Sequence, residues 1–328
     1  MGKDIKLSVI VPVWNAEAFI EQTLCSLVNQ TLDGIEIICI DDGSTDSSGQ
    51  ILDYYASRFP NITVVHQEDL GQANAVNRGL RMARGEYVAE CDSDDFVAFN
   101  CYEKAYKLAT DPKFDRHADA VRFGWYGIYD DGSLEPMFYN AEDEYFGIPI
   151  CPTELSDYEC GMVFGRMAAL FSGIYRREFL LENELFWREG HNFEDTCVEF
   201  KVRAMAEDYR LIKEPLYYYR RNNPNSGNNT IFDDDAIFEQ FDEIDRFIDE
   251  HHLEHLHGIM NAMRYMTICK WSLPRGDMSK QRVTEMFEKM EKDFAVRPTE
   301  YYYLPSQKDW LNYNIIASGL WRVTGVLK

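Results

Sequence analysis

The sequence predicts an α/β fold, in which a mostly parallel β-sheet is flanked by helices and followed by a C-terminal helical extension. Apolar runs typical of buried strands alternate four times with helical patterns between residues 7 and 95, which indicates βαβ units. Acidic clusters directly follow two of these strands, so we expect them at the sheet edge where open α/β folds bind ligands. After residue 230 the apolar residues recur at helical spacing.

Length and composition limit the class of protein. The chain has 328 residues, of which 45% are hydrophobic, so it can bury a large core in two domains or in one domain with an extension. The formal net charge of −23 argues against a nucleic-acid binder, which needs a basic face, and against simple electrostatic docking on anionic lipid. The eight scattered cysteines favour a reducing compartment. With no signal-peptide core or membrane-spanning run recognised, we expect a cytoplasmic protein.

The first predicted strand covers residues 7–13, and Pro12, which cannot donate a ladder hydrogen bond, is expected to stop it. Asn15 is expected to cap the helix that follows. The positions of that helix that recur at helical spacing are Phe19, Ile20, Thr23, Leu24, Leu27 and Val28.

The second predicted strand, residues 35–40, runs directly into the acidic sequence DDGSTD of residues 41–46. A helix through residues 51–55 follows and is expected to end before Pro60. Together these features form the second strand–helix repeat.

The third predicted strand covers residues 62–66. A short helix follows at residues 72–83 and is closed by Gly85. The apolar run at residues 87–89 is the fourth strand, and it leads to Asp92 at the carboxyl edge of the sheet.

The densest group of charges is the sequence ECDSDD at residues 90–95. Carboxylates this close repel one another, which favours a divalent cation with oxygen ligands, and such ions often accompany a phosphate-bearing substrate. The alternative is a solvated acidic turn that caps the next helix. Asp41 and Asp42 are expected at the same edge, which strengthens the metal interpretation. A redox Rossmann fold is rejected, because no Gly-x-Gly-x-x-Gly follows the first strand.

The middle of the chain carries fewer signals. Residues 120–129 read as a strand that turns at residues 130–132. Aromatic residues are frequent from Phe123 to Phe146. They are interpreted as ordinary core, with a sugar-stacking platform as the alternative.

Three motifs in order carry a resemblance to a known family. The sequences VIVPVWN (residues 9–15), IDDGSTD (40–46) and DSDD (92–95) resemble those of the family-two glycosyltransferases. The resemblance continues at residues 173–180 and 217–221. It implies the GT-A-like nucleotide-diphospho-sugar transferase fold. It also implies transfer of a sugar, as in hexosyltransferases, from a nucleotide-sugar donor with inversion and with Mn²⁺ or Mg²⁺.

The resemblance also implies a site for the donor base, commonly uracil. The backbone of Pro12, Val13 and Trp14 and the carboxylate of Asp41 would hold the base. Glu17 matches an acidic position of the family near the donor.

In the Asp-x-Asp (DXD) motif, the resemblance places Asp92 by the ribose and metal, followed by Ser93. Asp94 would ligate the metal that bridges the diphosphate. Asp95 is expected either in this cluster or as a cap of the following helix.

The loop and helix at residues 71–79 match the family with Asn77 in place as a donor-side residue. Many relatives carry Arg where this chain has Val76. Gln72 or Arg78 would substitute for it, and the sequence does not decide between them.

The resemblance assigns the general base to Asp195, with Glu194 orienting it or the acceptor. A helix N-terminus favours an anion, so Asp195 is expected to stay ionised. The alternative is a capping carboxylate without chemistry. Arg220 and Arg221 occur where relatives place cations over the donor phosphates, or they end a solvated strand. A histidine frequent in relatives is missing from residues 222–229, which leaves a third metal ligand open.

The expected domains are a catalytic domain at residues 1–230 and a helical extension at 231–328. Within the first, residues 1 to about 110 form the donor half and residues 111 to 230 the acceptor half. The acceptor would be a hydroxyl of a glycan or lipid-linked molecule in polysaccharide assembly. Two alternatives are an inactive relative that serves as a binding or scaffold protein and a sugar-nucleotide pyrophosphorylase. The latter is disfavoured because no Gly-rich loop with Arg and Lys follows the first strand.

The extension begins with an amphipathic helix at residues 233–254 that has an acidic outer face. His251 and His255 have the i,i+4 spacing of zinc ligands but are interpreted as a surface helix end. Residues 307–328 are rich in large apolar groups. They are expected to pack on their own domain or on a second subunit of a homodimer, with membrane contact at most peripheral.

Overall fold

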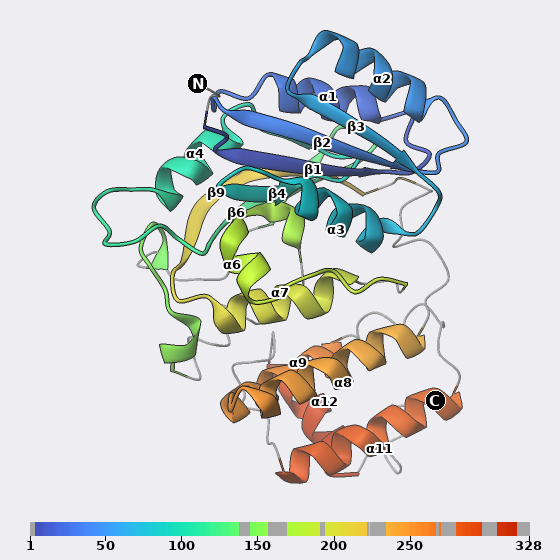
Figure 1. Ribbon diagram of the computed structural model, residues 1–328. Coiled ribbons are helices and arrows are strands. Elements are labelled where there is room, and N and C mark those ends of the chain that lie inside the picture. The colour runs from blue at the N-terminus through green and yellow to red at the C-terminus, as the bar shows by residue number, and fades with distance from the viewer. Residues whose placement is uncertain are drawn as a thin grey trace. The chain divides into compact units, whose positions relative to one another are not determined.

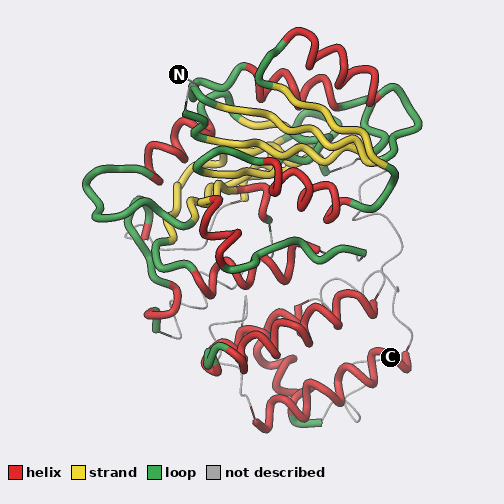
Figure 2. The backbone as a smooth tube through the Cα atoms, viewed as in Figure 1, coloured by secondary structure: helices red, strands yellow, loops and turns green. Residues whose placement is uncertain are grey.

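The chain divides into two units, residues 1–152 with 168–226, and residues 153–167 with 227–328. The described part of the first unit is α/β and that of the second is helical (Figures 1 and 2). The expected domain boundary at residue 230 stays a prediction. The computed structural model describes residues 4–137, 145–156, 169–190, 194–221, 223, 234–266, 269, 280–296 and 307–319.

The first unit is built on a nine-stranded sheet with the order β3-β2-β1-β4-β8-β6-β9-β5, and β7 pairs with β6. Parallel pairing joins β3 to β2, β2 to β1, β1 to β4, and β6 to β9. Strands β8, β5 and β7 run antiparallel to their neighbours. Six of the nine strands therefore share one direction, so the expected mostly parallel sheet is confirmed. The strands are β1 Leu7–Val13, β2 Ile35–Asp42, β3 Ile62–Gln67, β4 Tyr87–Glu90, β5 Phe96–Val97, β6 Ala120–Ile128, β7 Leu134–Met137, β8 Gly173–Arg176 and β9 Tyr209–Arg220.

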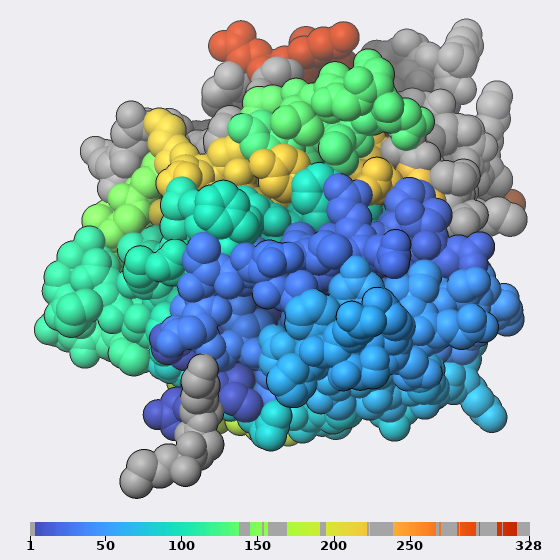
Figure 3. Space-filling model, turned by 90° about the horizontal axis from the view of Figure 1, so that it is seen from above, coloured from blue at the N-terminus to red at the C-terminus, as the bar shows by residue number. Residues whose placement is uncertain are grey.

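Helices flank both faces of the parallel half of the sheet. Helices α1 and α2 lie on one face and α3 lies on the other (Figure 1). Figure 3 shows the face that α1 and α2 cover, in blue and light blue. Because both faces are covered, all seven residues of β1 are buried. The helices of this unit are α1 Ile20–Val28, α2 Ser48–Arg58, α3 Gln72–Met82, α4 Cys101–Ala109, α6 Arg177–Glu182 and α7 Glu194–Met205.

Two local expectations at the start of the chain are wrong. Pro12 does not stop β1, since it lies inside the strand opposite Ile40. Strand β4 pairs with β1 only as far as Ile10, so beyond that point β1 has a neighbour on one side only and tolerates proline. Asn15 does not cap α1. Its φ is 47°, and its Oδ1 accepts the N–H of Thr45 at 2.8 Å, which ties the turn after β1 to the turn after β2.

The aromatic residues of β6 pack against protein. Phe123 is fully buried, Trp125 meets the Phe171 ring edge-on with centroids 5.8 Å apart, and Tyr126 stacks on Tyr218 at 5.4 Å. These contacts support the core interpretation for β6. Residues 138–144 of the aromatic stretch lie outside the described residues.

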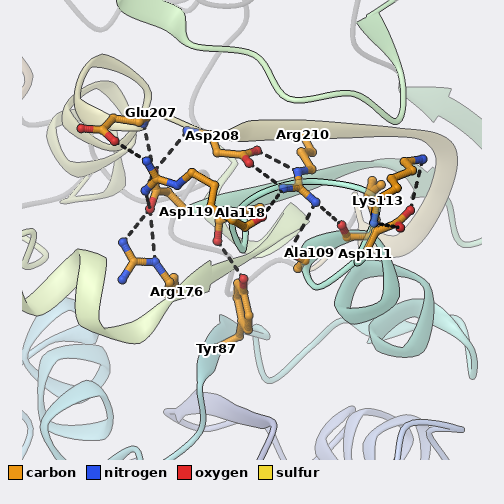
Figure 4. A network of polar contacts seen from close by, with 12 residues as sticks. Tyr87, Ala109, Asp111, Lys113, Ala118, Asp119, Arg176, Glu207, Asp208 and Arg210 are labelled. Carbon is orange, nitrogen blue, oxygen red and sulfur yellow. Dashed lines mark hydrogen bonds and ion pairs between the residues drawn. The ribbon is translucent and has the colours of Figure 1, made fainter.

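A buried polar network holds together the amino ends of the parallel strands (Figure 4). Asp119 accepts hydrogen bonds from Arg176 at 2.7 Å and from the N–H groups of Glu207 and Asp208 at 3.0 and 3.2 Å. Tyr87 donates its hydroxyl to the carbonyl oxygen of Ala118 at 2.8 Å. Each of these polar groups thus has a hydrogen-bond partner. The network lies at the edge of the sheet opposite the acidic clusters.

The described part of the second unit consists of helices. The apolar stripe of α8 is buried at Phe241, Ile244, Phe247 and Ile248, so the expected amphipathic helix is confirmed. The helix ends at Glu250. His251 and His255 lie beyond it and are exposed, in agreement with a surface helix end. The helices are α8 Asp234–Glu250, α9 His257–Met266, α11 Lys280–Val296 and α12 Gln307–Ala317.

The described part of the C-terminal segment packs on its own unit. Tyr313 and Ile316 of α12 are buried, and the Tyr313 ring meets that of Tyr265 of α9 edge-on at 5.9 Å. Tyr265 also donates to Asp309 Oδ1 at 3.2 Å. Residues 320–328 lie outside the described residues. No helix in the described ranges is long and apolar enough to cross a membrane.

Candidate active site

The candidate site lies at the carboxyl edge of the sheet. Because six strands share one direction, the ends of β1, β2, β4 and β9 meet at this edge. Asp41 stands at the end of β2, Asp92 two residues after β4, and Arg220 at the end of β9. The topology therefore gathers at one edge residues that lie far apart in the sequence.

Asp92 lies in a strongly acidic environment. Burial raises its pKa to about 7, with further contributions from the negative charges of Asp94 and Asp195. Its Oδ1 accepts a hydrogen bond from Gln72 Nε2 at 3.1 Å, which partly offsets this rise. The electrostatic effect of Asp195 on Asp92 shows that the structure brings these two predicted site residues into one neighbourhood.

Asp94 and Asp95 have different surroundings. Asp94 accepts a hydrogen bond from Asn223 Nδ2 at its Oδ2, at 2.7 Å. Asp95 is 1% exposed and accepts bonds from the Tyr217 hydroxyl at 2.8 Å and the Arg220 N–H at 2.7 Å. Helix α4 begins only at Cys101, so the expectation that Asp95 caps it is wrong. Asp95 instead joins the acidic loop to β9.

The acidic loop suits a divalent cation by its donor chemistry. Two carboxylates, Asp92 and Asp94, follow one strand end, and the raised pKa of Asp92 reflects its burial and then the negative charges of Asp94 and Asp195. Each carboxylate has about four lone-pair positions, so the bonds from Gln72 to Asp92 and from Asn223 to Asp94 leave capacity for a cation. Among the described residues, no group of three or more His, Cys, Asp or Glu side chains could hold a metal ion. Mg²⁺ sites commonly use one or two carboxylates and complete their shell with water and substrate phosphates.

The two arginines at the end of β9 point to different surroundings. Arg220 donates from Nε to the Asp94 carbonyl oxygen at 2.9 Å, and its guanidinium lies 4.6 Å from the Phe19 ring centroid. Arg221 lies toward the β6–β7 hairpin, where its Nη2 is 3.9 Å from Glu135 Oε2. The structure thus joins Arg220, and not Arg221, to the acidic loop.

Asp41 is buried and held in one orientation. Its Oδ1 accepts the N–H of Ser44 at 3.1 Å, and its Oδ2 is 2.7 Å from His66 Nδ1. The hydrogen bond to Asp41 raises the pKa of His66. A Cβ added at Gly49, in the first turn of α2, would lie 2.9 Å from Asp41 Oδ2, so this carboxylate requires a glycine there.

Near Asp41, the carboxylates of two further residues accept hydrogen bonds from backbone N–H groups of the neighbouring turns. Asp42 accepts the N–H groups of Leu70 and Gly71 at 3.0 and 2.8 Å and has a structural role. Glu17 accepts the N–H of Ser47 at 2.9 Å, so its carboxylate lies at the start of α2.

The residues expected to frame the base differ in exposure. Pro12 and Val13 are buried at the end of β1, whereas Trp14 is 51% exposed. The carbonyl oxygen of Ser93 accepts the hydroxyl of Thr23 at 2.9 Å. Trp14 therefore offers its indole at the rim, while Ser93 is tied to α1.

On helix α3, the side chains of Gln72 and Arg78 have different partners. Gln72 reaches Asp92, as described above, whereas Arg78 donates to Gln67 Oε1 at 2.9 Å. Val76 is fully buried. Asn77 is also buried, and its amide binds the Trp187 backbone. Of the residues considered for the missing arginine, Gln72 is the one that contacts the acidic loop.

Asp195 lies in the first turn of α7 and is partly buried. Burial, and then repulsion from Glu199 one turn further, raise its pKa to about 6, while the cation of Arg122 acts in the opposite direction. Arg122 is fully buried and donates to Glu199, which also accepts from Arg203. A carboxylate with this pKa can accept a proton near neutral pH. The side chain of Glu194 lies outside the described part of the structure.

Two residues at this edge, Tyr217 and Asn223, and the contact of Glu90 with Trp187 were not expected from the sequence. Tyr217 links Asp92 and Asp95, since it accepts the Asp92 N–H at 3.1 Å and donates to Asp95. Asn223 binds Asp94, and Glu90 accepts the indole N–H of Trp187 at 3.2 Å. The aromatic run at residues 217–219 gave no sign of these contacts. For Asn223 the sequence gave only a weak indication, namely that amide residues follow Arg220 and Arg221.

A family model described as "Glycosyl transferase family 2" matches residues 8–171. The glycosyltransferase GlyG of Streptococcus pneumoniae is 31% identical over 217 residues, which cover 66% of this chain and 70% of GlyG. The uncharacterized glycosyltransferase EpsJ of Bacillus subtilis is 32% identical over 222 residues, or 67% of this chain and 62% of EpsJ. The match thus leaves about a third of each relative uncovered.

The fold is similar to that of a protein solved with a nucleotide sugar. A crystal structure of S. aureus TarS in complex with UDP-GlcNAc superposes with a TM-score of 0.71. It covers 97% of this chain and 92% of that chain at 20% identity. The similarity confirms the GT-A-like fold expected from the sequence.

Proposed function

The chain belongs to glycosyl transferase family 2, and we propose on this premise that it transfers a sugar from a UDP-sugar to a hydroxyl group, with inversion. The observation that carries the proposal is the gathering of Asp41, Asp92 and Arg220 at the carboxyl edge of the sheet, with Asp195 near enough for its charge to act on Asp92. A transferase needs such an arrangement, because the acceptor base and the donor diphosphate must meet at one carbon.

The donor site is assigned to the edge between β1 and β4. Asp41 accepts hydrogen bonds only, so as a carboxylate it favours a base that presents an N–H, such as uracil. Pro12, Val13 and Trp14 would line the base, and Glu17 would act indirectly by ordering the turn at the start of α2. TarS, which shares this fold, was solved with UDP-GlcNAc, and this supports a UDP-sugar.

The metal is assigned to Asp92 and Asp94, which would hold Mn²⁺ or Mg²⁺ together with the donor diphosphate. When bound, the cation supplies positive charge next to the leaving group. Gln72 orients Asp92, and Asn223 orients Asp94. Arg220, next to this loop, would add a further cation for the phosphates.

The chemical step is a single displacement. Asp195 accepts the proton of the acceptor hydroxyl as that oxygen forms a bond to the anomeric carbon. The bond from that carbon to the diphosphate breaks, and UDP leaves with the electron pair. The pKa of about 6 keeps most Asp195 ionised at pH 7. Glu194 would orient Asp195 or the acceptor. A glycan or lipid-linked molecule is the proposed acceptor class.

A thermal-shift screen of nucleotide sugars, each with and without Mn²⁺, tests the donor assignment, because a ligand that binds the folded state raises its melting temperature. We expect the largest shift with a UDP-sugar plus Mn²⁺, followed by release of UDP on incubation. Binding without any release of UDP would instead support an inactive binding protein.

The stereochemistry tests the displacement. Attack by an acceptor oxygen on an α-linked donor gives a β-linked product, which the anomeric proton coupling reports by NMR. An α-linked product would contradict the single displacement.

A further inference from the structure

Asn77 of α3 is buried against the segment that precedes α7. It is 1% exposed. Its Nδ2 donates to the Trp187 carbonyl oxygen at 2.8 Å and to Glu189 Oε1 at 3.0 Å, and its Oδ1 accepts the Trp187 N–H at 2.9 Å. Both amide hydrogens are therefore used within the protein, and none remains for a donor molecule.

The Trp187 indole continues this connection to the acidic loop. Trp187 is 4% exposed, and its Nε1–H donates to Glu90 Oε2 at 3.2 Å. Gln72 Nε2 donates both to Glu90 Oε1 at 3.3 Å and to Asp92 Oδ1 at 3.1 Å. We call Gln72, Asn77, Glu90 and Trp187 the Trp187 bridge. It forms a continuous hydrogen-bonded path to the Asp92 carboxylate.

Glu189, which Asn77 also contacts, has a second hydrogen-bond partner on α3. Glu189 accepts from Asn74 Nδ2 at 3.1 Å as well as from Asn77. Hydrogen bonds from Asn77 and Asn74 lower the pKa of Glu189, so it stays ionised and accepts both bonds at neutral pH. Helix α7 begins at Glu194, five residues after Glu189.

We propose that the Trp187 bridge fixes the position of helix α7, which carries Asp195, relative to Asp92. Asn77 and Trp187 are then positioning residues for transfer and not donor contacts. The inference rests on the proposed function, in which Asp195 is the base. A misplacement of about 1 Å far from the reacting atoms can cost about 100-fold in rate. The bridge should therefore affect turnover more than nucleotide affinity.

The test compares Asn77→Ala and Trp187→Phe with the wild type. UDP-GlcNAc with Mn²⁺ serves as the probe for turnover, followed as UDP release, and UDP with Mn²⁺ serves as the probe for binding by calorimetry. We expect kcat to fall about 10- to 100-fold, while the Kd for UDP changes less than about 2-fold.

Tyr87→Phe is the matched control. Like Trp187→Phe, it removes one buried hydrogen bond of β4, but at the opposite end of the strand. We expect it to lower the melting temperature without lowering kcat. If the bridge variants lose no more activity than Tyr87→Phe at equal loss of stability, their role is merely structural and the proposal is wrong.

A compensating pair gives a sharper test. Asn77→Asp places a carboxylate against Glu189 and should lower kcat. Adding Glu189→Gln restores the donor–acceptor pair with residue 189, although not the bond to the Trp187 carbonyl oxygen, and should recover part of the lost rate. No recovery, or a loss of UDP affinity in Asn77→Ala as large as its loss of kcat, would overturn the proposal.

The proposal is separable from the proposed function. A wild type that releases no UDP from any nucleotide sugar would contradict the function alone. Hydrogen exchange of the peptide at residues 194–205 then decides about the bridge. We expect faster exchange in Asn77→Ala than in Tyr87→Phe, and equal exchange would refute the bridge.

Discussion

Two carboxylates of the candidate site, Asp92 and Asp195, have pKa values raised to about 7 and about 6. For both, burial is the main cause and neighbouring negative charge is the second. Raised pKa values of this kind occur where proton transfer or cation binding is needed, as well as in structural ion-pair networks. Positions at the carboxyl edge of a parallel sheet favour the functional origin here.

Replacing Asp94 by Asn should weaken binding of UDP in the presence of Mn²⁺ by about 10-fold or more, because one negative ligand of the proposed metal is lost. The fold should stay intact, since Asp94 lies in a loop beyond a strand end and not in the core. Calorimetric titration measures the affinity, and circular dichroism checks the fold. Asp115→Asn removes one exposed carboxylate elsewhere and is the control. Unchanged affinity in Asp94→Asn would remove this residue from the site.

Replacing Asp195 by Asn should keep UDP affinity and lower kcat by about 10²–10⁴-fold, the usual contribution of a general base. The active form of the base is ionised, so wild-type kcat should fall as the pH falls through about 6. With Mn²⁺ saturating, so that Asp92 stays ionised as a metal ligand, the variant should lose this acidic limb. Rates between pH 4.5 and 8 measure both effects, with Glu182→Gln as a surface control. Near wild-type turnover in Asp195→Asn would mean that Asp195 is only a helix-end carboxylate.

At the scale of elements, α3 is the part of the fold whose packing most directly positions the site. It carries Gln72 and Asn77 and packs on β1 through Gly79. A Cβ at Gly79 would lie 2.4 Å from Ile10 Cγ2, closer than van der Waals contact allows. The glycine thus permits the close approach of helix and strand that brings Gln72 to Asp92.

Gly79→Ala should therefore destabilise the protein by about 1–3 kcal/mol, the usual cost of overpacking, although alanine is the better helix former. Thermal unfolding measures the effect. Met82→Ala on the exposed side of the same helix should change stability by less than about 0.5 kcal/mol. A Gly79→Ala variant as stable as the wild type would show that α3 can move away from β1 without cost.

At the scale of the whole molecule, the second unit depends on its last described helix. The buried Tyr313 and Ile316 of α12 and the bond from Tyr265 to Asp309 join α12 to α9. Each large buried side chain contributes about 1.5–3 kcal/mol by removal from water. The unit should therefore not keep its stability without α12.

Deleting residues 300–328 should lower the melting temperature by about 5 °C or more, or dissociate an oligomer. Deleting only residues 320–328 retains α12 and is the control. Thermal melting and light scattering measure stability and mass. A truncated protein of equal stability and mass that no longer sediments with anionic vesicles would instead favour a membrane role for this segment.

The sequence by itself determined the elements of the parallel half and the acidic residues at its edge. Strands such as β1 and β2 are buried on both faces, so their apolar runs are a local property of the chain. The positions of Asp41 at a strand end, Asp92 just after a strand and Asp195 at a helix start followed from the same local patterns.

Only the tertiary structure decided how these residues are held. Asp95 binds Tyr217 across 122 positions of sequence, and Asn77 binds Trp187 across 110. Hydrogen bonds over such separations leave no periodic trace, because each partner alone is compatible with many environments. For the same reason Asn15, expected to cap its own helix, instead binds Thr45. Local patterning specifies strands and helices, whereas the choice of polar partners requires the packed chain.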